Sequence, residues 1–155
     1  MDINNELLIF LVSASPVVEL RGAIPIGIAK GLSLGKVFVF ALAGNLLPIP
    51  LLLLFFRWVV TRLEHLRPIE KIFKWWFRRV EKKSKIVETY GFWGLVFFVS
   101  IPFPGTGAWT GSVAATLFNF RMKKAIVAIS LGVLLAAIFV TLGSMGLVKL
   151  WCIFI

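Results

Sequence analysis

Long uncharged stretches of unequal length dominate the hydrophobic pattern of this chain. Val37–Phe56 has no charged residue in 20 positions, and Ala125–Val148 has none in 24. A helix that crosses a membrane needs about 20 predominantly apolar residues. The pattern therefore predicts one membrane-spanning helix at each of these two stretches.

A third stretch, Thr89–Phe120, is too long for one ordinary span and too short for two. It is interrupted by PFPGTG at 102–107, and two prolines and two glycines in six residues end a helix. The part before the break, Gly91–Ile101, would rise about 16 Å as a helix, which is about half of a ~30 Å hydrocarbon core. We therefore expect a re-entrant hairpin over 89–120, with both ends on the same side of the membrane.

The N-terminal region repeats this pattern. Leu7–Val18 and Gly22–Ala29 are short uncharged stretches, and the break lies near Pro16–Gly22. We therefore expect a first re-entrant hairpin over 1–36, followed by the span at 37–56.

The second hairpin is likewise followed by a basic loop and a transmembrane helix, which occupies 121–155 with the C-terminus. The chain therefore reads as an internal repeat within one membrane domain. Small residues also recur at every fourth position in both returning arms, where they let helices approach closely; they are Gly27, Gly31, Gly35, Gly107, Gly111 and Ala115.

A basic linker, 57–88, separates the two halves. Its apolar residues fall at helical spacing and are Ile69, Ile72, Phe73, Trp76, Phe77 and Val80. Basic residues take the opposite face and are Lys71, Lys74, Arg78, Lys82 and Lys85. This pattern is typical of an amphipathic helix that lies on the membrane surface, here with Trp75 and Trp76 as interfacial anchors. The linker acts as a topology determinant or, alternatively, as a recruitment site for anionic lipid.

The net charge of +10 follows from these basic segments and not from a nucleic-acid surface. If 57–88 and 121–124 are cytoplasmic, 13 Lys and Arg lie inside and three lie outside, as the positive-inside rule requires. In this orientation the two halves are inverted relative to each other. Inverted repeats with broken helices are an architecture of transporters, with the site near the membrane midplane between the repeats.

Composition places the chain in the membrane. Hydrophobic residues make up 59% and charged residues 15%, and the mean hydropathy is +0.95. A soluble domain has about a quarter of its residues charged. We therefore expect an all-α integral membrane protein. The N-terminus lacks the positive charge of a secretory signal, so we expect residues 7–14 to belong to the mature fold.

One Cys and one His argue against an intrachain disulfide, a metal site, a cofactor or a catalytic triad. We therefore expect a protein that is not an enzyme.

Glu19 and Arg21 are the ionisable residues of the first predicted tip. Charged groups inside a membrane are costly and face a cavity or each other. They form either a neutralising pair that pins the tip or part of a polar site. We favour the site, because returning arms that begin near Gly22 and Gly107 would point helix N-termini, which attract anions, at the membrane centre. Glu19 could also take up a proton and so couple transport to protons.

The second tip offers backbone chemistry. We expect Thr106 to cap the second returning arm, and Gly105 and Gly107 to let a ligand approach the main chain. The candidate substrate-binding residues are Glu19, Arg21, Gly22, Pro25, Asn45, Pro102, Pro104, Gly105, Thr106 and Gly107.

Several other polar or aromatic residues have two interpretations. Asn45, with Pro48 and Pro50, either kinks the first span or lines the pathway. Trp109 fits packing better than substrate contact, and His65 fits an interfacial position better than proton transfer. The hydroxyl side chains of the second hairpin either line its returning arm or form hydrogen bonds with its backbone; they are Ser100, Thr110 and Ser112.

Two motifs resemble the signatures of a known family. ELRGAIPIG at 19–27 and SIPFPGTGAWTG at 100–111 are similar to those of the bacterial and archaeal small multidrug export proteins. That family resembles the DedA group of VTT-domain membrane proteins, and the resemblance covers nearly the whole chain. It implies two inverted re-entrant hairpins with transmembrane helices.

For DedA-like proteins the resemblance also implies transport of the lipid carrier undecaprenyl phosphate, with essential acidic and basic residues at the hairpins. Glu19 and Arg21 match these positions in the first hairpin. DedA proteins carry Arg residues around their proline-rich tip, whereas residues 98–108 here contain none. The resemblance therefore leaves the identity of the substrate open.

We expect a transporter or flippase of an amphipathic anion such as a polyprenyl phosphate, in the plasma membrane of a prokaryote. A chain this small is expected to act as a homodimer or higher homo-oligomer. Two alternatives are a proton-coupled small-molecule or multidrug exporter and a non-transporting scaffold or lipid-binding protein. No nucleic-acid partner is expected.

Overall fold

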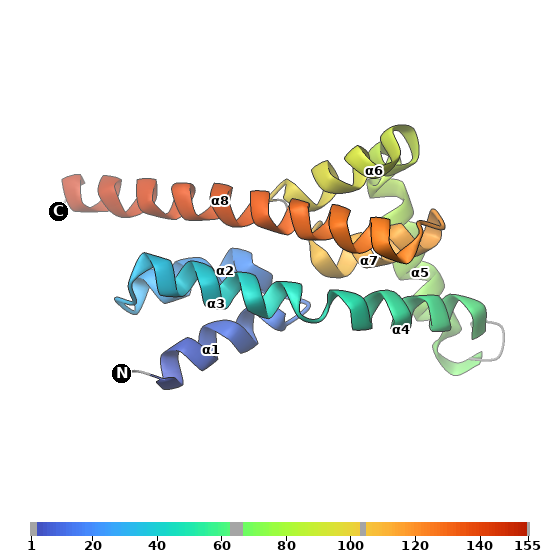
Figure 1. The fold of residues 1–155 in the computed structure, drawn as a ribbon, viewed down its shortest axis with the longest axis horizontal. Helices are drawn as coiled ribbons and strands as arrows, with labels where there is room; N and C mark the ends of the chain where they lie inside the picture. Colours follow the sequence, from blue (N-terminus) through green and yellow to red (C-terminus); the bar gives the residue numbers. More distant parts are fainter. Residues whose placement is uncertain (1–2, 63–66, 103–104, 155) are drawn as a thin grey trace. The chain divides into compact units, whose positions relative to one another are not determined.

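The computed structural model describes residues 3–62, 67–102 and 105–154, and the regular elements in these ranges are helices (Figure 1). They are α1 (Ile3–Ala14), α2 (Glu19–Ala29), α3 (Leu34–Leu46), α4 (Ile49–Arg62), α5 (Arg67–Lys83), α6 (Lys85–Ser100), α7 (Ala108–Leu117) and α8 (Met122–Phe154). The predicted all-α fold is thereby confirmed for these residues.

Two helical stretches are long and apolar enough to cross a membrane. Leu34–Arg62 has 29 residues and a hydropathy of 2.3, and Met122–Gly146 has 25 residues and a hydropathy of 2.7. Helices that could cross a membrane are therefore present at both predicted spans. The first is not one unbroken helix over 37–56, because α3 ends at Leu46 and α4 begins at Ile49. Pro48, which lacks a backbone N–H, lies at this break.

The chain divides into two compact units. Unit 1 comprises Met1–Leu47 and Val133–Ile155, and unit 2 comprises Pro48–Gly132.

In unit 1, α1, α2 and α3 pack against one another, and α2 runs back along α1 as a helical hairpin (Figure 1). An ion pair of 2.6 Å joins Glu6 Oε1 to Lys36 Nζ, so the first turns of α1 and α3 lie at the same end. Gly44 of α3 lies so close to α1 that a Cβ there would be 2.2 Å from the Phe10 carbonyl oxygen. The predicted helix–break–helix arrangement is present, and its entry into the membrane from one side stays a prediction.

In unit 2, α7 packs against α4, α5 and α6. Helix α6 changes direction at Gly91, where φ is 55° and ψ is −122°. The arm before the second break is therefore Phe92–Ser100, slightly shorter than predicted. The first part of α8 packs on this arm, since a Cβ at Gly132 would lie 2.6 Å from Val99 Cβ.

Both returning helices end in the same local motif. In α2 the N–H of Leu32 donates to Gly27 O (3.2 Å) and that of Gly31 donates to Ile28 O (2.9 Å). In α7 the N–H of Phe120 donates to Ala115 O (2.9 Å) and that of Asn119 donates to Thr116 O (3.1 Å). This is the Schellman C-cap. Its left-handed residues are Gly31 (φ 75°) and Asn119 (φ 54°), 88 positions apart, and a long apolar helix follows each.

The Schellman motif also corrects the predicted stripe of small residues. Gly27 packs closely, with Val37 Cγ2 2.7 Å from a Cβ built there, but Gly31 and Gly35 have no atom within 4 Å of such a Cβ. Since α2 ends at Ala29, these two glycines do not belong to the packed face of that helix.

Helix α5 is amphipathic as predicted, but protein covers part of its apolar face. Phe77 is 7% exposed and Val80 is 3% exposed. The Trp76 ring packs against Phe56 of α4 with centroids 5.4 Å apart. Trp75 is 60% exposed, as expected of an interfacial anchor. An apolar helix face is stabilised by burial against protein as well as against lipid, which is why periodicity alone could not distinguish the two.

Candidate functional site

The first tip carries a buried carboxylate on a strained backbone. Glu19 is 7% exposed and has a φ of 52°, in the left-handed region that costs a non-glycine residue about 1–2 kcal/mol. Arg21 is half-buried and lies close enough to Glu19 for an electrostatic interaction. The structure therefore brings together the two ionisable residues predicted for this tip. Residues in such conformations cluster at functional sites.

The returning helix begins earlier than predicted. Helix α2 starts at Glu19, so Gly22 lies one turn inside it and does not mark its N-terminus. A Cβ at Gly22 would lie 2.2 Å from Val18 Cγ1, so a neighbouring side chain covers this glycine. Pro25 is exposed within the same helix. The N–H groups of Glu19 and Gly22 donate to Ser15 O and Val18 O, both at 3.2 Å, so these two groups are not open to the anion expected at this tip.

Asn45 lies one residue before the end of α3 and is 1% exposed. The predicted interruption of the first span at this place is confirmed. Its Nδ2 atom has no hydrogen-bond partner among the described residues. Thr141 Oγ1 of α8 is in the same condition. Buried polar atoms are usually paired. Thr141 was not among the residues predicted from the sequence, although a signal was present, because it is one of three hydroxyl residues in a long apolar helix.

The second tip follows α6 and precedes α7. Gly107 is the N-cap of α7 with a φ of 144°, so the returning arm begins where predicted. No side chain caps this helix at Gly107, and the Thr106 hydroxyl donates to Ile101 O at 2.7 Å, so the expected cap by Thr106 is replaced by a bond across the tip. Pro102 is exposed, and Pro104 lies outside the described residues.

Most remaining polar candidates bond backbone carbonyls nearby. The Ser112 hydroxyl donates to Ala108 O (2.7 Å) and the Ser100 hydroxyl donates to Phe97 O (2.9 Å). Trp109 packs edge-on against Phe56 with ring centroids 6.5 Å apart, which confirms its packing role. His65 lies outside the described residues.

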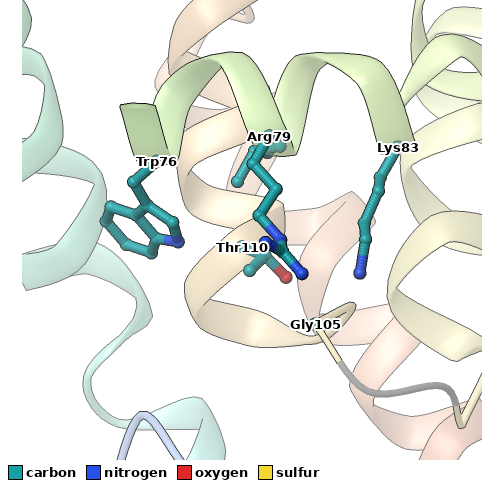
Figure 2. A pocket seen from close by; sticks show the side chains of 6 residues that line it. Trp76, Arg79, Lys83, Gly105 and Thr110 are labelled. Atoms are coloured by element: carbon teal, nitrogen blue, oxygen red, sulfur yellow. The ribbon is translucent and has the colours of Figure 1, made fainter. Parts of the chain in front are cut away.

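A recess of about 70 Å³ lies beside the second tip. It is lined by Trp76, Arg79, Val80, Lys83, Gly105 and Thr110. Figure 2 shows the Arg79 and Lys83 side chains extending from α5 toward Gly105 and Thr110. A Cβ at Gly105 would lie 3.0 Å from Lys83 Nζ. The second tip therefore has cationic neighbours even though its own sequence has none.

Arg79 and Lys83 were not among the predicted site residues. A signal was present in the helical spacing, because Arg79 lies three positions after Trp76 and Lys83 lies three positions after Val80. No group of three or more His, Cys, Asp or Glu residues that could hold a metal ion occurs within the described ranges.

The family comparison covers both tips. Residues 19–139 match the family model described as "Putative small multi-drug export protein", which spans most of the chain and includes both tips. The chain belongs to this family. Comparisons with curated proteins and with solved structures give no match. Together with the two long apolar helices, the family description indicates a membrane protein of the export type.

Proposed function

We propose that this member of the small multidrug export family is a membrane transporter of amphipathic anions. The observation that carries the proposal is the first tip, where a buried, strained Glu19 lies beside Arg21. An arginine guanidinium offers fork geometry suited to phosphate or carboxylate. A pair that only pinned the tip would not need a glutamate in a left-handed conformation.

A polyprenyl phosphate such as undecaprenyl phosphate is the substrate we propose. The support is that Glu19 and Arg21 match the acidic and basic positions that the resemblance to DedA-like proteins implies for the first hairpin. The phosphate of such a lipid also has to be shielded from the hydrocarbon by protein. Two inverted halves would let the anion be received from either side of the membrane, and two or more copies of the chain would close the pathway.

A second candidate is proton-coupled export of small molecules, which the family description favours. In this case Glu19 would take up the proton, and a cationic substrate would not need Arg21. The two candidates therefore differ in what they require of the first tip.

The deciding experiment measures flipping of a labelled polyprenyl phosphate in proteoliposomes. We compare the unmodified protein with Glu19→Gln and Arg21→Ala, using Lys71→Gln on the exposed side of α5 as a charge-loss control. An anion carrier loses flipping in both tip variants and keeps it in the control.

Other outcomes select between the rivals. Transport of a cationic drug that is lost in Glu19→Gln and kept in Arg21→Ala would establish the exporter. A folded, inserted protein that moves neither substrate would refute transport and leave a scaffold or lipid-binding protein.

A further inference from the structure

The basic residues of α5 lie on two faces that differ in their surroundings. Arg79 and Lys83 line the recess beside the second tip, together with Trp76 and Val80. Arg78 and Lys82 belong to the opposite face expected from the spacing and, with Trp75 and Arg79, line a separate, wider recess of about 370 Å³. The four side chains are all exposed, and the two pairs differ in that Arg79 and Lys83 border Gly105 and Thr110 of the second tip.

The recess has the charge and shape of an anion site. Its described lining residues include two cations and no acid. The Arg79 guanidinium also lies 5.4 Å from the Trp75 ring centroid, a contact that orients it without neutralising its charge. Thr110 belongs to the first turn of α7, so the recess borders a helix N-terminus whose first N–H groups have no partner within the helix.

Gly105 forms the part of the recess that lies at the second tip. Its φ of 84° is accessible to glycine at little cost, and the absence of a side chain leaves room for Lys83 Nζ over the tip. A larger residue here would push the ammonium group away from the recess.

We propose that this recess binds a phosphate group, with Arg79 and Lys83 as its cationic ligands. A phosphomonoester carries about −1.5 to −2 charges at pH 7, which two cations match. The guanidinium can bind two phosphate oxygens at once, and the ammonium contributes a compact point charge. One water needs about 10–15 Å³ of such space, so the cavity accommodates a group of phosphate size.

This inference deepens the proposed function, because it names the residues that hold the anionic group at the second tip. The inference depends on the proposed function only where it gives the recess a role in transport. Binding at the recess is a property of unit 2 and is measured without transport.

The test measures equilibrium binding of inorganic phosphate, and separately of a phosphomonoester lipid, to the full chain in phosphatidylcholine nanodiscs. Three double variants are compared: Arg79→Gln with Lys83→Gln, the charge-matched control Arg78→Gln with Lys82→Gln, and the charge-conserving Arg79→Lys with Lys83→Arg. We expect the first to bind at least about tenfold more weakly and the other two to stay within about threefold of the unmodified protein.

Each outcome has a definite meaning. Weaker binding in the recess variant alone supports the site. If inorganic phosphate and the lipid both bind, the phosphate group itself is the ligand. If only the lipid binds, the ligand is a lipid headgroup. Equal weakening in the control variant would indicate a diffuse basic surface and overturn the site. Unchanged binding in the recess variant, or no binding to the unmodified protein, would also overturn it. No phosphate binding to an unmodified protein that still transports the lipid would refute this site only. Binding that the recess variant loses, in a protein that transports neither substrate, would refute the proposed function only.

Discussion

Glu19 combines three properties that are rarely found together in a residue with a purely structural role. It is ionisable, it is 7% exposed and its backbone is left-handed. The position 88 residues later is Gly107, which also has a positive φ. The two turns differ, because Gly107 combines a φ of 144° with a ψ of −166°, a conformation open essentially to glycine, whereas Glu19 holds a side chain at a φ of 52°.

This difference predicts how Glu19 variants behave. Glu19→Gly removes the left-handed strain of about 1–2 kcal/mol and should leave the thermal unfolding midpoint in detergent unchanged or higher. It should nevertheless abolish transport, as Glu19→Gln does. If the residue only pinned the tip through its charge, Glu19→Gly would lower the midpoint, and that result would contradict a functional role.

Asn45 provides a second prediction at the residue scale. Leucine has nearly the shape of asparagine and no polar atoms, so Asn45→Leu removes a buried amide that lacks a partner for Nδ2 among the described residues. An unsatisfied buried donor costs about 1–3 kcal/mol. We expect a raised unfolding midpoint together with reduced transport; a lowered midpoint would show that the amide is paired and structural.

At the scale of elements, close helix contacts organise each unit. Gly132 of α8 faces α6, with Val96 O 2.8 Å from a Cβ built at this glycine. Gly143 lies in the same helix with no atom within 4 Å of its built Cβ. The two glycines therefore form a matched pair for a test of packing.

Gly132→Ala is expected to destabilise the protein by about 1–3 kcal/mol, because the added methyl group overlaps α6. Gly143→Ala should be neutral or stabilising by up to about 1 kcal/mol, since alanine favours a helix. Thermal unfolding in detergent measures both. A similar change in the two variants would show that α8 and α6 do not pack as described.

Helix α5 shows how an element with an evident pattern can serve more than one purpose. Its apolar and basic faces were recognisable from spacing, and the helix is present at Arg67–Lys83. Burial of Phe77 and Val80 makes it part of the packing of unit 2, while Arg79 and Lys83 bring charge to the second tip.

At the scale of the whole molecule, the distribution of basic residues predicts the orientation in the membrane. With 13 Lys and Arg on one side and three on the other, the side with 13 should face the cytoplasm. In a Cys152→Ser background, Gly35→Cys should react with a membrane-impermeant maleimide in intact cells. Lys82→Cys and Lys123→Cys should react only after permeabilisation, and the reverse pattern would refute this topology.

The amino-acid sequence alone sufficed for features that depend on local chemistry. Length and apolarity marked the two long helices, proline and glycine marked the breaks, and helical spacing marked the amphipathic segment. Glu19 and Arg21 also stood out, because ionisable residues are rare in apolar stretches. Each of these signals is contained within a few neighbouring residues.

Packing decided the rest. The approach of Lys83 to Gly105 and the contact of Gly132 with Val99 depend on how helices meet. Lys83 and Gly105 are separated by 21 intervening residues, and spacing along the chain carries no information about such a contact. The second tip therefore lacks charge in the sequence and acquires cationic neighbours only when α5 folds against α7.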